Sequence, residues 1–242
     1  MKYITLLILI CFLQPANAQD TIIKHFDSNW KEVCKEKANY YRKIFKNNKE
    51  TWTVCDYYVS DQIQMAGTYK SKKLKKKNGL FEFYYEDGTK KKEGEFFNNK
   101  YNGVWKWYHK NGKISSREIY KKNRLKEIEC WNEDGSIVEG KIGKIILAEF
   151  VGGDSALKDF IATHVIYPLK AQKKGIQGRV LVKFIIGFQG EIEKSWIVEY
   201  AHPLLIDEAL RVVNSMPNWI PGKAHNLPSK VSFTIPINFR LN

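Results

Sequence analysis

Apolar and polar residues alternate strictly from Val231 to Phe239, near the end of the chain. This is the pattern of a half-buried β-strand. Pro236 lies in the middle of the strand, and proline has no N–H to donate to a sheet ladder. We therefore expect the strand at the edge of a sheet. An exposed edge invites pairing with another chain and is normally blunted or covered, which raises the question of what is added to this one.

The residues before this strand alternate between helical and strand periodicity. An apolar stripe at helical spacing predicts an amphipathic helix with Asp154 or Ser155 as N-cap and Pro168 as its end; it comprises Leu157, Phe160, Ile161, His164 and Val165. We expect His164 to be a partly buried packing residue.

"GRVLVKFII" and "IEKSWIVE" predict two strands joined at "GFQGE". A second helix is predicted to begin at Pro203 and to be stopped by Pro217. The order helix, strand, strand, helix, strand predicts a small α+β layer of helices on one antiparallel sheet.

The first half of the chain contains a repeat. "GLFEFYYEDG" at 79–88 returns as "GVWKWYHKNG" at 103–112 and weakly as "KEIECWNEDG" at 126–135. A period near 24 residues is typical of repeat architectures. Each unit predicts two short aromatic strands joined by a two-residue Asp-Gly or Asn-Gly turn. Upstream, residues 39–58 predict another hairpin with "KNNKE" as its turn, and residues 28–37 a short helix.

Alignment of the units predicts which side chains share the buried face of the hairpins. Phe81, Trp105 and Ile128 occupy one column, and Phe83, Trp107 and Cys130 occupy the next column on the same face. Aromatic cross-strand contacts add roughly 0.2–1 kcal/mol each. Cys130 is then expected to be a small apolar filler rather than a reactive thiol.

The first eighteen residues have the features of a signal peptide. Lys2, the apolar run "ITLLILICFL" and "ANA" before Gln19 predict export with cleavage between Ala18 and Gln19. The apolar run spans ~15 Å of helix, about half of the ~30 Å that a bilayer requires. The alternative is an uncleaved anchor in the inner membrane. We expect a periplasmic protein.

Charge and proline content divide the remaining chain. Residues 19–145 carry 28 basic and 18 acidic side chains, residues 146–242 carry 11 and 8, and no proline lies between Pro15 and Pro168. We interpret the organisation as a signal peptide (1–18), an N-terminal segment (19–55), hairpin repeats (56–136), a linker (137–147) and a C-terminal domain (148–242). The lysine runs at 72–77 and 90–92 can suit nucleic acid. In an exported protein we interpret them as solvated loops, or as contacts to an anionic envelope component, and expect no nucleic-acid partner.

The sequence holds no catalytic, metal-binding or cofactor-binding motif. It lacks HExxH, GxSxG and Walker patterns, and its five histidines are scattered. Asp207 and Glu208 are adjacent on a helix and point to different sides, so they do not form a catalytic pair. Cys34 and Cys55 could form a disulfide in an oxidising compartment, which the sequence leaves open. We expect no enzyme, cofactor or metal.

The second half resembles the C-terminal domain of TonB, the energy transducer of outer-membrane uptake, over about residues 148–242. The residues that carry the resemblance are Tyr167-Pro168, Ala171-Gln172, Gly175, Gly178, Val180, Val182, Phe184, Gly190, Asp207, Glu208, Ala209, Leu210, Trp219, Pro221-Gly222 and the closing "VSFTIPINF".

The resemblance implies that the last strand receives a short peptide from the plug of an outer-membrane receptor by β-augmentation. The positions implied in binding are Tyr167, Pro168, Gln172, Ser232, Phe233, Thr234, Ile235, Pro236, Ile237, Asn238 and Phe239. It further implies a role in transmembrane transport of nutrients, with inner-membrane proton-motor proteins as partners if the leader is an anchor. The alternative is a homodimer, in which a second copy of the chain pairs with the same edge strand.

Residues 56–136 resemble the MORN-like repeats of YwqK-type proteins, whose units consist of an aromatic strand, a turn with glycine and a following "G-x-Y/F". The third unit departs from this pattern, because Lys126 stands where Gly79 and Gly103 stand. The resemblance implies a hairpin sheet without indicating an activity. The alternative function is therefore a periplasmic scaffold whose repeats bind an envelope component without energy transduction.

Overall fold

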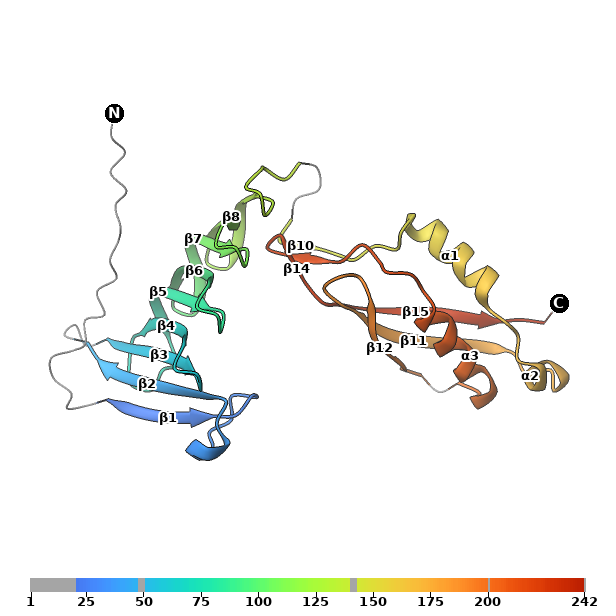
Figure 1. Ribbon diagram of the computed structural model, residues 1–242, viewed down its shortest axis with the longest axis horizontal. Helices are drawn as coiled ribbons and strands as arrows, with labels where there is room; N and C mark the ends of the chain where they lie inside the picture. Colours follow the sequence, from blue (N-terminus) through green and yellow to red (C-terminus); the bar gives the residue numbers. More distant parts are fainter. Residues whose placement is uncertain (1–20, 48–50, 140–142, 200, 242) are drawn as a thin grey trace. The chain divides into compact units, whose positions relative to one another are not determined.

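The computed structural model describes residues 21–47, 51–139, 143–199 and 201–241 (Figure 1). The chain forms two compact units, Met1–Trp105 with Ile119–Leu125, and Lys106–Glu118 with Lys126–Asn242. The predicted signal peptide and its cleavage site lie outside the described residues, as do parts of the "KNNKE" turn and of the predicted linker.

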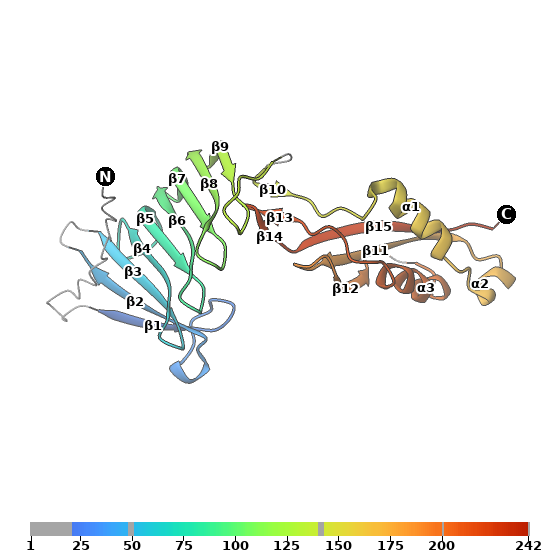
Figure 2. The same cartoon turned by 45° about the horizontal axis from the view of Figure 1, so that its top comes forward.

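The first part of the chain is a nine-stranded antiparallel sheet, here called the hairpin sheet, in which the strands follow chain order (Figure 2). Its strands are β1 (Ile22–Phe26), β2 (Tyr40–Lys46), β3 (Trp52–Tyr58), β4 (Ile63–Tyr69), β5 (Lys77–Tyr84), β6 (Lys90–Phe97), β7 (Lys100–Tyr108), β8 (Ile114–Lys121) and β9 (Arg124–Cys130). The predicted hairpin sheet is confirmed. The helix predicted at 28–37 is wrong, because only a 3-10 turn at Lys35–Lys37 forms there, and β1 was not predicted.

Two kinds of turn alternate along the hairpin sheet. At the repeated Asp-Gly and Asn-Gly sites the glycine adopts a left-handed conformation after a tight turn, with Gly88 N–H donating to Tyr85 O at 3.0 Å. These are three-residue loops rather than the predicted two-residue turns. The two-residue turns lie at the opposite ends of the strands, where Asn98–Asn99 and Lys122–Asn123 have positive φ at both positions.

One face of the hairpin sheet, here called the aromatic face, holds the columns predicted from the repeat. Phe81 and Trp105 are 0% exposed. A Cβ added at Gly67 would overlap the ring of Phe81, and one at Gly94 would overlap the ring of Trp105. Each ring therefore lies against the backbone of a neighbouring strand at a glycine, which is how a single sheet buries large aromatic side chains.

The described cysteines are free. Cys130 is 3% exposed, and burial, together with the nearby Glu118 charge, raises the pKa of its thiol to about 11. The predicted role as an apolar filler is confirmed. Cys34 is exposed and Cys55 half-buried, and the disulfide left open between them is not formed.

The second part of the chain contains the predicted α+β domain. Its helices are α1 (Gly153–His164), α2 (Leu169–Lys173) and α3 (Pro203–Asn214), and its main sheet has the order β12 (Ile192–Ile197), β11 (Gly178–Ile186), β15 (Val231–Phe239). A small second sheet, not predicted, consists of β10 (Ile145–Ile146), β13 (Lys223–Ala224) and β14 (Leu227–Pro228).

Two local predictions about the helices are wrong. The N-cap of α1 is Gly152, in a left-handed conformation and without a side-chain cap, rather than Asp154 or Ser155. The helix ends at His164, and Pro168 is instead the N-cap of α2. Short helical turns such as α2 have too few residues to show a periodic pattern.

The core of this domain is apolar. Alternate residues of β11 (Val180, Val182, Phe184 and Ile186) are 0% exposed. They pack with the apolar stripe of α3, which includes Leu205, Ala209, Val212 and Val213. The sheet is thus covered by helix on one face, as layered α+β domains require.

A polar cluster inside the second unit holds the turn between β13 and β14. His225 stacks on Trp107 with ring centroids 3.9 Å apart, and its Nδ1 lies 2.6 Å from Glu118, which is 0% exposed. Ser116 Oγ also donates to Glu118 at 3.1 Å. Oε1 of the buried carboxylate therefore has two hydrogen-bonding partners, as burial of a charge demands.

Candidate functional site

The last strand, β15, lies at the end of the sheet order and, among the described residues, pairs with β11 alone. Ile235, Ile237 and Phe239 are buried, whereas Ser232, Thr234, Pro236 and Asn238 are exposed. The predicted alternation and the predicted edge position are both confirmed. The strand leaves one row of backbone groups without a strand partner in the described part of the chain.

The register shows which backbone groups face outward. Val198 N–H donates to Leu181 O at 3.1 Å, so Leu181 directs its backbone groups toward β12. In an antiparallel ladder, N–H and C=O of one residue point to the same side. Leu181 and its β15 partner Pro236 are therefore a pair without mutual hydrogen bonds, and Pro236 faces the open edge.

This geometry defines what the open edge offers to an added strand. By the same alternation, Ser232, Thr234 and Asn238 present N–H and C=O groups outward, and Pro236 presents only its C=O. Pro236 therefore leaves the ladder with β11 intact and removes one donor from the middle of the open edge.

A groove of about 660 Å³ runs beside this edge, between β15 and α1. Figures 1 and 2 both show α1 lying along β15. One wall is the apolar stripe of α1, with Leu157, Ile161 and Val165. The other wall is β15, with Ile235, Pro236, Asn238 and Phe239, and the charged residues of the lining are Asp154, Lys158 and Arg240. The groove is therefore apolar along its walls and carries charge of both signs.

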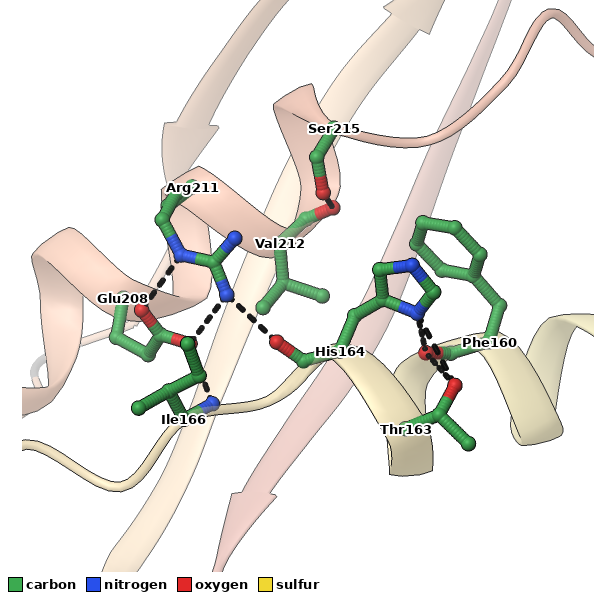
Figure 3. A network of polar contacts seen from close by, with 8 residues as sticks. All are labelled: Phe160, Thr163, His164, Ile166, Glu208, Arg211, Val212 and Ser215. Carbon is green, nitrogen blue, oxygen red and sulfur yellow. Dashed lines mark hydrogen bonds and ion pairs between the residues drawn. The ribbon is translucent and has the colours of Figure 1, made fainter.

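A hydrogen-bond network fastens the C-terminal end of α1 to α3 (Figure 3). Glu208 accepts from Ile166 N–H at 2.6 Å and from Arg211 Nε at 2.8 Å, and Arg211 Nη2 donates to His164 O at 2.6 Å. Hydrogen bonding from Arg211 lowers the pKa of Glu208, so this carboxylate is ionised at neutral pH. Because α1 has no fully buried residue, this network and the half-buried stripe position the wall of the groove.

The imidazole of His164 differs from the prediction of a partly buried packing residue. His164 is exposed and stacks on Phe160 with ring centroids 3.8 Å apart. Its Nδ1 lies 2.9 Å from the carbonyl oxygen of Phe160, one helical turn earlier (Figure 3). The stripe at helical spacing predicted the helix correctly, but the side chain of His164 is exposed, whereas Ile161 and Val165 of the same stripe pack against the core.

The structure brings some of the predicted binding residues together and leaves others apart. Tyr167 lines the groove with Ile235, Pro236, Asn238 and Phe239. Its hydroxyl donates to Ile176 O at 2.6 Å, and its ring meets Phe239 edge-on at 5.7 Å. Ser232, Phe233 and Thr234 lie further along β15, and Phe233 packs against Trp219 in the core. Pro168 is the N-cap of α2 and Gln172 lies within that helix, and neither residue lines the groove.

The wall formed by α1 was not predicted as part of a site. Its apolar stripe was visible in the sequence but was assigned to core packing. A stripe at helical spacing shows only that one face of a helix avoids water. It does not distinguish a buried face from one that borders a groove.

The described residues include no group of three or more His, Cys, Asp or Glu side chains that could hold a metal ion. Among the same residues, no helix is both long enough and apolar enough to cross a membrane. Along β15 the site offers backbone hydrogen bonding to a partner, and the groove offers apolar contact.

Together these features define a small α+β domain with an open edge strand beside an apolar groove. Residues 163–241 match the family described as Gram-negative bacterial TonB protein C-terminal. The match covers less than half of the chain and supports a TonB-like role at the cell envelope in general terms. It begins at the penultimate residue of α1, so the match includes the wall formed by β15 but leaves out most of the wall formed by α1. No curated protein and no solved structure matches the chain.

Proposed function

We propose that this protein binds a segment of an outer-membrane TonB-dependent receptor as an added strand on the open edge of β15, in the transport of nutrients across that membrane. The observation that carries the proposal is the open edge itself, located inside the segment that matches the TonB C-terminal family. Addition of a strand to an exposed sheet edge is a common mode of peptide recognition.

The edge sets the strength of such a complex. About five or six backbone hydrogen bonds at ~0.5–1.5 kcal/mol each contribute some 3–8 kcal/mol before ordering costs. That corresponds at best to a micromolar dissociation constant. The apolar wall of α1 adds contact area for those side chains of the added strand that point toward the groove. The complex is transient, as a protein that repeatedly engages and releases receptors requires.

The test uses the chain from Gln19 onward as bait for detergent-solubilised outer membranes. Thr234→Pro removes an outward N–H and leaves the ladder with β11 intact, so receptor capture falls. Pro236→Thr restores an outward N–H, so capture rises. Thr234→Ser is the matched control and behaves like the wild type. Equal capture by all four proteins would overturn recognition through this edge.

Localisation and partners follow from the same proposal. We place the protein in the periplasm with the leader removed, whereas an uncleaved leader would anchor it in the inner membrane beside proton-motor proteins. N-terminal sequencing of the purified protein decides between them, because cleavage leaves Gln19 as the first residue. A second copy of the chain is the competing occupant of the edge. Analytical ultracentrifugation would then show a dimer that Thr234→Pro dissociates.

A further inference from the structure

The loops of the hairpin sheet lie on two opposite rims, because its strands follow chain order and each runs antiparallel to the next (Figure 2). The loops β2–β3, β4–β5, β6–β7 and β8–β9 share one rim, here called the basic rim. These four loops belong to one compact unit, Met1–Trp105 with Ile119–Leu125. Their side chains can therefore be considered together as a single surface.

Exposed basic side chains gather on the basic rim. Five lysines lie at 70–76 and three basic residues at 121–124, and Lys46 and Lys100 flank the other two loops. The described residues of the four loops include no aspartate or glutamate. None of these basic side chains forms an ion pair with a carboxylate of the described chain. The basic rim therefore carries positive charge that the described residues leave without an ion-pair partner.

The opposite rim of the same unit is not basic. The loop β3–β4 contains Asp61, the loop β5–β6 contains Glu86 and Asp87, and neither loop contains a lysine or arginine. The loop β1–β2, residues 27–39, carries three residues of each sign. Charge that serves only solubility is best interspersed in sign over the surface. The separation of sign between the two rims indicates a negatively charged partner for the basic rim.

Hydrogen bonds between neighbouring loops hold the basic rim together. Asn99, in the β6–β7 turn, donates from Nδ2 to Lys75 O at 2.7 Å, in the β4–β5 loop. Asn123, the equivalent residue one repeat later, accepts at Oδ1 from Tyr101 N–H at 2.6 Å. The side chain of each turn asparagine thus binds the backbone of the preceding unit. The lysines are therefore presented side by side on connected loops.

Apolar side chains lie among the lysines of the basic rim. Leu74, in the β4–β5 loop, has a φ of 51°, a conformation that is uncommon for any residue other than glycine. Phe97 is 51% exposed, with Lys70 Nζ 5.5 Å from its ring centroid. Lys72 Nζ lies 5.6 Å from the ring centroid of Trp52, the first residue of β3. Basic and apolar side chains on one surface are typical of segments that bind at a membrane interface.

We propose that the basic rim binds the surface of a membrane that contains anionic phospholipids. Headgroup phosphates supply the negative charge that the rim lacks, and Leu74 and Phe97 contact the boundary between headgroups and acyl chains. The four loops span six strand spacings, roughly 30 Å along the sheet, so an extended anionic surface engages them together. Nucleic acid would engage the lysines but gives Leu74 no apolar contact. The rim lies in a different unit from β15, and the inference does not depend on receptor binding.

Co-sedimentation with vesicles tests this proposal. The chain from Gln19 onward is used, because the apolar leader would itself enter a bilayer. We expect binding to vesicles that mix phosphatidylglycerol with phosphatidylcholine, and much weaker binding to phosphatidylcholine alone. Binding should weaken as salt rises above physiological ionic strength, where the Debye length is already only about 8 Å. Equal binding to both kinds of vesicle, or binding that salt does not change, would overturn the proposal.

Paired charge removals locate the binding surface. Lys72→Gln with Lys73→Gln removes two charges from the basic rim and should weaken binding about ten-fold or more, since each lysine near an anionic surface contributes about five-fold. Lys35→Gln with Lys37→Gln is the matched control, because it removes two exposed lysines from the opposite rim of the same unit. It should change the affinity little. Equal losses in both double variants would mean that the net charge of +14 attracts the vesicles without a specific surface.

Leu74→Asn separates membrane contact from folding. Asparagine adopts a positive φ more readily than leucine, so this variant should unfold in urea no earlier than the wild type. It should nevertheless bind the mixed vesicles several-fold more weakly at equal salt. Tight binding of a single-stranded oligonucleotide by wild type and Leu74→Asn alike, without vesicle binding, would overturn the proposal and assign the rim to nucleic acid. Thr234→Pro leaves vesicle binding unchanged, so failure of receptor binding and failure of membrane binding are distinguishable.

Discussion

The hairpin sheet and the C-terminal domain bury apolar side chains in different ways. In the C-terminal domain, helices and a sheet enclose a core cluster made only of apolar residues. On the hairpin sheet, neighbouring side chains cover one another, and the only helical element among the described residues of β1–β9 is the turn at Lys35–Lys37. Five of the six buried polar residues of the described chain lie on these strands or their loops: Asp56, His109, Ser115, Ser116 and Glu118.

This difference determines where each part can carry function. A layered core excludes charge, so the C-terminal domain offers its backbone at the edge of β15. A single sheet keeps its buried side chains near water, so charged groups such as Lys77 and Lys92 can remain among the rings. Binding at the open edge of β15 should therefore depend on the backbone N–H groups of that strand. The properties of the aromatic face should depend on the side chains of the hairpin sheet.

The largest effect is expected from the core of the C-terminal domain. Phe184→Ala removes a ring that is 0% exposed and should lower the free energy of unfolding by about 3–5 kcal/mol. Phe188→Ala is the control, because Phe188 is 52% exposed, and it should have little effect. Urea unfolding followed by far-UV circular dichroism measures both. Equal losses would mean that the domain is not organised around this core.

The hairpin sheet should instead be sensitive at its glycines. Gly94→Val places a side chain where the Trp105 ring lies and should destabilise the protein by about 2–3 kcal/mol, as overpacking does. Glu95→Val, on the opposite face of the same strand, is the control and should be nearly neutral. Trp fluorescence during urea unfolding reports the change. Tolerance of valine at Gly94 would show that the ring has room to move.

The comparison also explains how much the sequence could predict. Elements with a long, regular period were predicted to the residue, as β11 and β15 show, because alternation over nine positions leaves one register. The turn types were wrong because an Asp-Gly pair fits both two-residue and three-residue loops. Short elements such as β10, β13 and α2 were missed because two to five residues are too few to show a repeated pattern.

Of the candidate site, the sequence predicted the edge strand but not the groove. The edge strand follows from alternation and a proline, which are local properties of the chain. The groove needs α1 beside β15, which is a long-range arrangement that no single segment encodes. The resemblance to MORN-like repeats and the predicted binding residues remain predictions.

A smaller effect is expected where a polar group is buried in the second unit. His225→Asn removes the imidazole that contacts Glu118 and keeps a residue that tolerates the positive φ of this turn. The loss of one hydrogen bond to a buried carboxylate should destabilise the protein by about 1–2 kcal/mol. Lys223→Ala, two residues away, is the control. Thermal unfolding at fixed pH measures the difference, and an unchanged midpoint would mean that Glu118 is satisfied without His225.

The effect that builds up most gradually is a pH dependence that separates the two faces of β6. Folding lowers the pKa of Lys92 from 10.5 to about 8, so between these values the unfolded chain holds more protons than the folded one. Stability therefore rises with pH in this window, by at most about 1.4 kcal/mol per pH unit. Subtracting the curve of Lys92→Met from that of the wild type isolates this rise from the tyrosines and cysteines that titrate nearby. Lys91→Met should retain most of the rise, because burial is the largest cause of the lowered pKa of Lys92 and the charge of Lys91 is a smaller one. A difference curve that stays flat between pH 8 and 10.5 would contradict this prediction.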